Sequence, residues 1–276
     1  MPLFNKVAVI GSGLIGGSIA LAIKKNKLAK EIVGVSLHQE SLKLALKRRA
    51  IDKGSLSLGI IAGADLIILA TPVDVIINSK NKISKIIDRN CIVIDVGSTK
   101  EKIVASLEKI FPNYVGTHPL AGSEKRGIVH AHSGMFKGSL CILTPTKITP
   151  KSTLERVRSL WVRLGAKVVL LSPREHDKVL AFTSHLPHIV AFALIGSVPN
   201  NSLKFAASGL KGTTRIAASN ALLWLDVFLS NKKNLLKALA IFESNLSQLK
   251  EAIRKNDEQA LKRILDKSRN KREQLK

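Results

Sequence analysis

The sequence predicts an α/β protein in which a doubly wound, mostly parallel sheet is followed by an all-helical domain. Three observations predict this fold class. Short apolar strands alternate with amphipathic helices from the N-terminus to about residue 171, a pattern typical of parallel sheets. The first strand enters a helix through a glycine-rich turn. Beyond Ser172 and Pro173 the strand signal ends and only helical periods follow. We therefore predict a sheet domain at residues 1–171 and a helical domain at residues 172–276.

The most informative motif lies in Val7–Ser18. After four apolar strand residues, Gly11, Gly13 and Gly16 give the spacing G-x-G-x-x-G at the start of a helix that runs from Leu14 to Ile23. In this strand–turn–helix setting the motif predicts a Rossmann-like dinucleotide site, because glycines allow the tight turn and the helix N-terminus binds a pyrophosphate. A glycine-rich turn without a ligand is the alternative. Two more cofactor contacts are expected next to the glycines, Leu14 and Ile15.

The end of the second strand, Glu31–Ser36, is where such a site selects its ribose. An acidic residue there would bind the 2′-hydroxyl of NAD and repel the 2′-phosphate of NADP. Ser36 is uncharged and does not repel the 2′-phosphate, so we favour NADP over NAD. The alternative is that the end of this strand faces solvent and the protein uses either cofactor. Thr71 follows the buried strand Asp65–Ala70 and is expected to face the cofactor from the same edge of the sheet.

The remaining elements continue the alternation and then become purely helical. A helix that is apolar on most sides, Val179–Ile195, needs a large surface to cover it, so we predict a homodimer formed through the C-terminal helices. Pro187 should kink this helix. Further strands are predicted at Cys91–Val96, Tyr114–Thr117, Leu140–Thr144 and Lys167–Leu171, and further helices at Glu40–Arg49, Ser152–Leu164, Ala221–Leu229, Lys232–Arg254 and Asp257–Arg272.

The charge balance is strongly basic. The chain has 44 Lys and Arg against 20 Asp and Glu, a formal net charge of +24, which would suit a nucleic-acid binder. However, the basic residues are spread along the whole chain and only 4% of the residues are aromatic. We therefore predict a solvated basic surface without a nucleic-acid partner. Such a surface would draw an anionic small-molecule substrate toward a cleft.

The two cysteines and the apolar runs bear on the compartment. Cys91 and Cys141 each lie in a strand-like run, which predicts buried free thiols in a reducing compartment rather than a disulfide or a metal site. No apolar run approaches the roughly 18–20 residues of a membrane span, and the N-terminus leaves no room for a signal peptide. We therefore predict a cytoplasmic protein with no membrane or metal partner.

Three further segments carry side chains suited to chemistry. His118 follows a sheet strand, where a base for nicotinamide chemistry would lie, although a loop histidine without function is the alternative. His185 and His188 are three apart inside an apolar helix, and no nearby carboxylate or cysteine completes a metal site around them. Arg215 follows a glycine-rich turn, where it can bind a carboxylate in bidentate fashion or form a surface salt bridge.

Five segments together resemble the prephenate/arogenate dehydrogenase family of tyrosine biosynthesis. The glycine-rich segment is common among dehydrogenases, but the joint occurrence of the other four is specific, and the matches cover essentially the whole chain in the family's order. The five segments are Gly11–Ser18, Asp95–Lys100, His118–Glu124, Ser184–His188 and Thr214–Ala217.

The resemblance implies an NAD- or NADP-dependent oxidative decarboxylation of prephenate to 4-hydroxyphenylpyruvate and CO2. It implies His118 as the base that accepts the substrate's hydroxyl proton, with Ser98 hydrogen-bonded to the same region of the substrate. His188 and Arg215 would hold the two substrate carboxylates. Two more residues of the matching segments are expected among the substrate contacts, Ser123 and Thr214.

Two features bear on the choice of substrate and on the alternatives. Family members commonly carry an Asp where this chain has Gly212, so Arg215 is held differently here if that Asp normally positions it. Members that resemble the arogenate-specific type can lack the second histidine, whereas this chain keeps His188, which favours prephenate over arogenate. The remaining alternatives are a β-hydroxyacid or imine reductase and a non-catalytic basic protein that binds nucleotides or nucleic acid.

Overall fold

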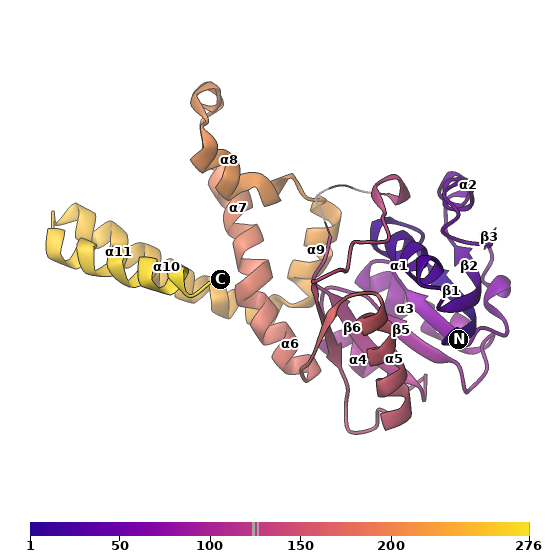
Figure 1. Cartoon of the computed structure of the whole chain (residues 1–276). Coiled ribbons are helices and arrows are strands. Elements are labelled where there is room, and N and C mark those ends of the chain that lie inside the picture. The colour runs from indigo at the N-terminus through magenta and orange to yellow at the C-terminus, as the bar shows by residue number, and fades with distance from the viewer. Residues whose placement is uncertain (123–124, 126, 276) are drawn as a thin grey trace. The chain divides into compact units, whose positions relative to one another are not determined.

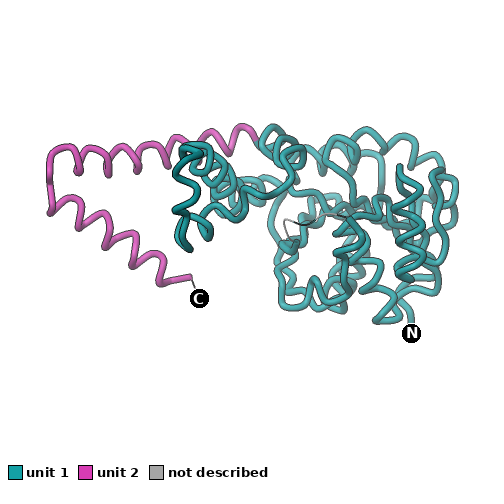
Figure 2. Tube along the Cα trace, turned by 90° about the horizontal axis from the view of Figure 1, so that it is seen from above, with its two compact units in different colours: residues 1–231 teal, residues 232–276 magenta. Residues whose placement is uncertain are grey.

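The computed structural model describes residues 1–122, 125 and 127–275 of the chain. It divides into two compact units, residues 1–231 and residues 232–276 (Figure 2). The first unit holds the sheet and the helices that follow it. The second is a pair of helices. The boundary predicted between residues 171 and 172 lies inside the first unit and stays a prediction.

The first unit is built on one eight-stranded sheet in the order β3-β2-β1-β4-β5-β6-β7-β8 (Figure 1). All neighbouring strands are parallel except β6 and β7, which confirms the predicted doubly wound, mostly parallel sheet. The strand β3 was not predicted, because its three residues, Lys-Gly-Ser, show no apolar alternation. The strands are β1 (Phe4–Ile10), β2 (Ala29–Val35), β3 (Lys53–Ser55), β4 (Leu66–Leu69), β5 (Ile92–Asp95), β6 (Tyr114–Pro119), β7 (Leu140–Thr144) and β8 (Lys167–Leu170).

Both faces of the sheet are covered, which explains why its strands are continuous apolar runs. Along β4, Ile68 packs into the core on one face and Ile67 into the core on the other, and both are completely buried. Each such side chain stabilises the fold by about 1.5–3 kcal/mol through burial. Side chains of α1 (Leu14–Lys25), α2 (Gln39–Lys47) and α5 (Lys151–Arg163) pack on the first face, and those of α3 (Val73–Ser84) and α4 (Glu101–Leu107) on the second.

The helical part of the first unit begins earlier than the apolar pattern indicated. The Oγ of Ser172 accepts the backbone N–H of Glu175, and the Glu175 carboxylate accepts the N–H of Ser172, so a capping box starts α6 at Pro173. A π-helical turn over Ala181–His185 precedes Pro187, at the place where a kink was predicted. The helices are α6 (Pro173–Leu180), α7 (Leu186–Gly196), α8 (Ser208–Thr214) and α9 (Ala221–Ser230), with short 3-10 turns at Asn200–Phe205 and Arg215–Ala218.

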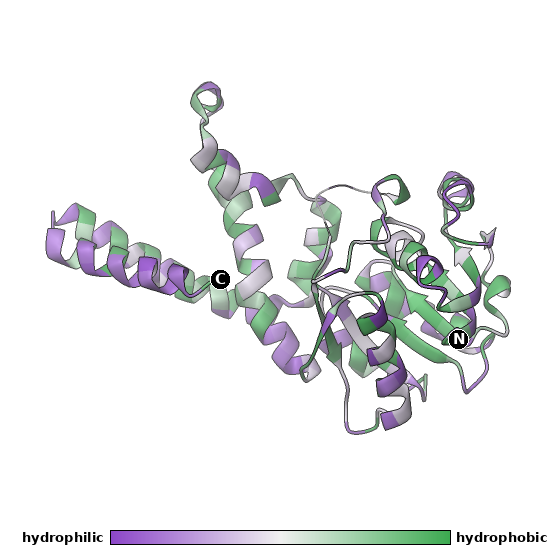
Figure 3. Cartoon of the chain, viewed as in Figure 1, coloured by the Kyte–Doolittle hydropathy of each residue, from purple (hydrophilic) through white to green (hydrophobic). Residues whose placement is uncertain are grey.

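One expectation about apolar length was wrong. The helical run Pro173–Gly196 has 24 residues and an 18-residue window of mean hydropathy 1.7, so among the described residues it is long and apolar enough to cross a membrane by length and composition. The predicted helix started too late, at Val179, because α6 and its capping box were missed. Only 22% of the window is buried, and Figure 3 shows apolar residues along α7. Two buried hydrogen bonds tie the run to the sheet half of the same unit: His176 Nε2 pairs with His118 Nδ1, and the Asp177 carboxylate accepts the backbone N–H of Lys100.

The second unit consists of α10 (Lys232–Arg254) and α11 (Glu258–Glu273), which fold back on each other (Figure 2). The carboxylate of Asp257 accepts the N–H of Ala260 and so caps α11. The unit is too small to bury its apolar side chains by itself. Several remain more than half exposed: Leu236, Ile241, Leu246, Ile253 and Leu265.

Candidate active site

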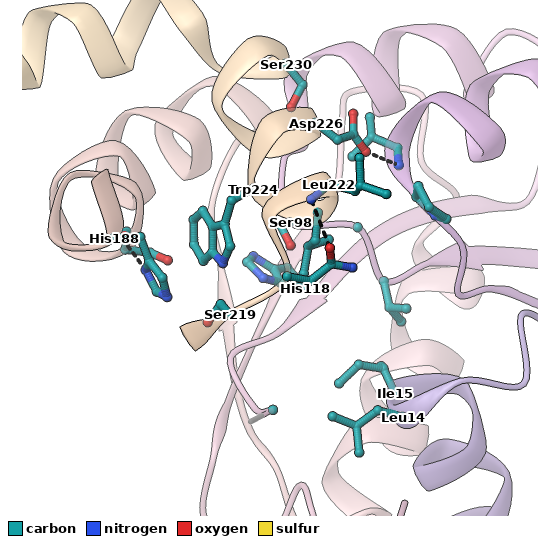
Figure 4. Close-up of a pocket in the computed structure, with 18 of the residues that line it drawn as sticks. Leu14, Ile15, Ser98, His118, His188, Ser219, Leu222, Trp224, Asp226 and Ser230 are labelled. Atoms are coloured by element: carbon teal, nitrogen blue, oxygen red, sulfur yellow. Dashed lines mark hydrogen bonds between the residues drawn. The ribbon is translucent and has the colours of Figure 1, made fainter. Parts of the chain in front are cut away.

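A cavity of about 1490 Å³ lies at the carboxyl edge of the sheet in the first unit. The turns that follow β1, β4, β5 and β6 line one side, and residues of α6, α7 and α9 line the other (Figure 4). Eight of the residues predicted to act in a site meet here: Gly13, Leu14, Ile15, Thr71, Ser98, His118, His188 and Arg215. Of the others, Gly11, Gly16, Ser36 and Thr214 do not line the cavity, and Ser123 lies outside the described residues.

The glycine-rich turn has the geometry of a phosphate cradle. A Cβ on Gly11, whose φ is +103°, would lie 2.3 Å from the carbonyl oxygen of Ala70, and a Cβ on Gly16 would lie 2.0 Å from that of Gly11. Gly13 instead faces open space, where backbone can approach a ligand. No side chain caps the N-terminus of α1, and its first turn has no acidic residue. The free N–H groups of this turn fit the pyrophosphate of a dinucleotide.

A neighbouring polar atom also fits a ligand at this turn. Ser12 is only 4% exposed, and its hydroxyl has no hydrogen-bond partner among the described residues. A buried hydroxyl without a partner costs free energy, which a bound dinucleotide could offset. At the far edge, the Oγ of Ser36 accepts the N–H of His38, and Ser36 places no carboxylate at the end of β2.

His118 occupies the last part of β6 and is 9% exposed. Its Nδ1 lies 2.8 Å from Nε2 of His176, a residue of α6 that is completely buried. Burial, together with the neighbouring His176, Lys100 and His185, holds the pKa of His118 well below its usual value. The imidazole is therefore neutral near pH 7, as a general base must be.

A buried ion pair supports the strand ends beneath His118. Lys100 and Asp95 are both completely buried, and the ammonium group of Lys100 contacts the carboxylate of Asp95. The Tyr114 hydroxyl donates to the same carboxylate at 2.6 Å, and so does the backbone N–H of Gly97 at 2.9 Å. Since breaking one partner of a buried pair costs about 3–5 kcal/mol, this network fixes the turn that carries Ser98.

His188 faces the cavity from α7. Its Nδ1 lies 2.9 Å from the carbonyl oxygen of Ser184, so this nitrogen carries a proton and donates it, which leaves Nε2 for a ligand. The imidazole stacks on the indole of Trp224, with 3.5 Å between the ring centroids and 22° between the planes. Burial lowers the pKa of His188, and the positive charge of Arg215 lowers it further. An anion that bound both groups would favour the protonated imidazole.

Arg215 is the first residue of the 3-10 turn after α8, and its side chain is exposed at the cavity. The hydroxyl of the preceding residue, Thr214, donates to the carbonyl oxygen of Leu210 at 2.7 Å. Its hydrogen bond is therefore made within α8. A Cβ on Gly212 would meet no atom within 4 Å. The position at which the resemblance implies an Asp in other members therefore has open space in this chain.

Sequence reasoning missed four residues of this region: His176, Asp177, Trp224 and Asp226. The capping box at Ser172 would have placed the first two in a helix, but nothing in the sequence pairs His176 with His118. Trp224 lies in the predicted helix Ala221–Leu229, and nothing in the sequence pairs it with His188. The carboxylate of Asp226 accepts the N–H of Val73 at 2.8 Å and so links α9 to the start of α3. Burial raises the pKa of Asp226.

Two sequence profiles of one family match the chain. The prephenate dehydrogenase nucleotide-binding domain matches residues 19–170, and the prephenate dehydrogenase dimerization domain matches residues 172–267. The chain belongs to the prephenate dehydrogenase family. The resemblance inferred from the five segments is thereby confirmed.

Individual relatives of this family agree over the full chain. Prephenate dehydrogenase of Bacillus subtilis is 34% identical over 282 residues, which cover 98% of this chain and 76% of that relative. The crystal structure of Aquifex aeolicus prephenate dehydrogenase in complex with hydroxyphenyl propionate and NAD+ has a TM-score of 0.93 at 36% identity, and covers 99% of this chain and 98% of its own. Synechocystis arogenate dehydrogenase has a TM-score of 0.84 at 30% identity, covering 98% of this chain and 99% of its own.

The buried histidines of the site make stability depend on pH. The pKa values of His118, His176 and His185 are all lowered, mainly by burial, that of His185 to about 4. Between that value and the unfolded value of about 6.5, the unfolded chain binds more protons than the folded one, so stability falls as pH falls. By about pH 4, the titration of His185 alone should lower the free energy of unfolding by about 3 kcal/mol.

We therefore expect Tm to be lower at about pH 5 than at about pH 7.5, as thermal unfolding in matched buffers would show. The substitution His185→Asn removes one of the titrating groups and should make the difference in Tm smaller. An unchanged or larger acid-dependent difference in this variant would contradict the assignment.

Proposed function

We propose that this protein is a prephenate dehydrogenase that converts prephenate to 4-hydroxyphenylpyruvate and CO2 with NAD(P)+. The observation that carries the proposal is the placement of His118. A buried, neutral imidazole lines the same cavity as the uncapped N-terminus of α1 on one side and Arg215 and His188 on the other. A dinucleotide and a dicarboxylate bound in this cavity would thus both lie next to His118, which is the base.

The chain's residues divide the work of this reaction. His118 accepts the proton of the substrate's ring hydroxyl through Nε2, while Ser98 lines the cavity where it can hydrogen-bond to the same hydroxyl. Arg215 and His188 hold the two carboxylates, Arg215 by a bidentate contact that matches the guanidinium fork. As the hydroxyl proton passes to His118 and the hydride leaves the same ring carbon, the bond between the ring and its carboxylate breaks and CO2 is released. The electron pair of that bond completes the aromatic ring, and the resulting phenolate oxygen takes the proton back from His118.

The cofactor would be held by the glycine-rich turn, by Leu14 and Ile15, and by Thr71. Gly13 and these three residues line the cavity. When bound, NAD(P)+ supplies the hydride acceptor. Gly11 and Gly16 do not line the cavity, but because they lack side chains the turn and α1 can pack closely. The basic surface favours the approach of the dianionic substrate.

Purified protein assayed with prephenate or L-arogenate, each with NAD+ or NADP+, tests the proposal. We expect reduced nicotinamide and CO2 in equal amounts with prephenate, at a higher kcat/KM than with arogenate. Turnover of arogenate alone would move the function to the arogenate dehydrogenase of the same family. Reduction of the cofactor without CO2, or no turnover of either substrate, would overturn the proposal.

The choice of NADP over NAD rests on Ser36, which places no negative charge at the end of β2. The substitution Ser36→Asp should raise KM for NADP+ by about tenfold or more, because a carboxylate repels the 2′-phosphate, and should leave KM for NAD+ equal or lower. Steady-state kinetics with both cofactors measure this. An equal change for the two cofactors would show that Ser36 does not contact the ribose. Ser57→Asp, on the turn after β3 and not at the end of β2, is the matched control.

We further infer that the protein works as a homodimer in the cytoplasm. The profile of the dimerization domain over residues 172–267 and the exposed apolar side chains of the helices support the dimer. Cys91 and Cys141 are both buried and free, which suits a reducing compartment. Sedimentation of the purified protein tests the dimer, and a monomer at micromolar concentration would contradict it.

A further inference from the structure

The base of the proposed reaction is the end of a buried chain of hydrogen bonds. His118 Nδ1 lies 2.8 Å from His176 Nε2, and His176 Nδ1 lies 2.8 Å from Oδ1 of Asp177. His176 is completely buried and Asp177 is 2% exposed. Neither residue lines the cavity, so neither can touch the substrate from its present position. Their chemistry reaches the cavity only through His118.

Asp177 is held as an ionised acceptor. Its Oδ1 accepts the backbone N–H of Lys100 at 2.7 Å, and its Oδ2 accepts that of Glu101 at 2.9 Å, at the start of α4. Burial by itself raises the pKa of Asp177, but the hydrogen bonds from His176 and from these two backbone groups bring it below its usual value. An ionised carboxylate has no proton to donate.

The protons along the chain follow from this constraint. Because Asp177 only accepts, His176 Nδ1 must carry a proton. Burial lowers the pKa of His176, so its ring is neutral and its Nε2 is a bare lone pair. That lone pair can only accept, so His118 Nδ1 must carry a proton and donate it. The free lone pair of neutral His118 is then on Nε2, the ring atom that is left for the cavity.

We propose that His176 and Asp177 are positioning residues that hold His118 in the tautomer whose bare Nε2 receives the substrate's proton. The inference rests on the proposed function, because it assigns how that base is prepared. When Nε2 takes the proton, His118 becomes an imidazolium whose Nδ1–H still donates to His176. The fixed charge of Asp177 then stabilises the cation through the intervening ring, as the third member of a catalytic triad does.

The other charged or titratable groups near His118 and His176 do not fix the tautomer of His118. Lys100 and Asp95 form a buried ion pair, and the charge of Lys100 disfavours a second proton on either ring. His185, on the π-helical turn, acts on His118 only electrostatically and is neutral as well, since its pKa is about 4. Its Nδ1 is hydrogen-bonded to the amide of Asn231 and not to His118. Only His176 contacts the Nδ1 of His118 among the described residues.

Two variants of His176 separate orientation from packing. In His176→Gln the amide can still accept from His118 and donate to Asp177, whereas His176→Leu fills space and can do neither. We expect kcat with prephenate to fall about 10²–10³-fold in His176→Leu, with KM within about threefold, and to stay within about tenfold of wild type in His176→Gln. Asp177 is not substituted, because it also caps α4.

The tautomer of His118 can be measured without any substrate. Long-range 1H–15N correlation spectra of 15N-histidine-labelled full-length protein, assigned with His118→Asn, should show His118 protonated at Nδ1 and bare at Nε2 in wild type and in His176→Gln. A wild-type His118 protonated at Nε2 overturns the proposal, even if His176→Leu fails to fold. The proposal is also overturned if His176→Leu turns over prephenate near the wild-type rate, or if kcat falls equally in His176→Leu and His176→Gln. A wild type inactive on both substrates refutes the proposed function alone, since the spectra need no turnover.

Discussion

The substitution His118→Asn should lower kcat with prephenate by about 10²–10⁴-fold and leave KM within a few-fold. Asparagine keeps a side chain that can hydrogen-bond to His176 and roughly fills the space, but it cannot accept a proton at the position of Nε2. Because the base acts in the transition state and contributes little to ground-state binding, the loss should fall on kcat. Initial rates of cofactor reduction at saturating prephenate measure it.

The wild-type pH profile sharpens the same prediction. Since burial and neighbouring positive or titrating groups lower the pKa of His118, kcat/KM should stay level below the usual histidine value of about 6.5 and fall only at more acidic pH. That acidic limb should disappear in His118→Asn. The exposed His130, which does not line the cavity, offers the matched control His130→Asn with unchanged kinetics. Near-normal turnover of His118→Asn would remove His118 as the base.

The substitution Arg215→Ala should raise KM for prephenate by about 10²-fold or more and leave the Kd for the cofactor unchanged. A charge-assisted, bidentate contact to a carboxylate contributes about 1.5–3 kcal/mol, and leaving the carboxylate unpaired in a partly closed site adds to the loss. Steady-state kinetics give the first quantity, and cofactor titration followed by protein fluorescence gives the second.

Two comparisons identify the cause of that effect. Arg215→Lys keeps the charge but loses the planar fork, so KM should lie between those of wild type and Arg215→Ala. Arg174 is exposed on α6 outside the cavity, and Arg174→Ala should leave both quantities unchanged despite the same change in net charge. Equal weakening of substrate and cofactor binding in Arg215→Ala would point to a folding defect and contradict the assigned role.

The fold was predictable because its signals are local. The alternation of strands and helices, the glycines at the first turn and the buried state of Cys91 and Cys141 all follow from short stretches of sequence. The short strand β3 carried no pattern, and α6 was missed because its capping box precedes a polar turn rather than an apolar one. The length of the apolar run Pro173–Gly196 was also misjudged, because its first turns are polar.

The site was predictable only where a motif marked its residues. His118, His188 and Arg215 stood out by their surroundings in the sequence, and the structure brings all three to one cavity. The partners of His118 and His188 could not be found that way. His176 lies 58 positions from His118, and Trp224 lies on a different helix from His188, so each contact depends on tertiary packing. A single sequence does not report such pairs.

The most direct test of the central claim is a crystal structure of this protein with NAD(P)+ and 4-hydroxyphenylpyruvate, the proposed product. We expect the ligand's hydroxyl within about 3 Å of His118 Nε2, its carboxylate on Arg215 or His188, and the nicotinamide ring against the ligand at about 3–3.5 Å. A ligand bound in this cavity with its hydroxyl beyond hydrogen-bond reach of His118, or with the nicotinamide on the far side of the imidazole, would contradict the role of His118 as the base.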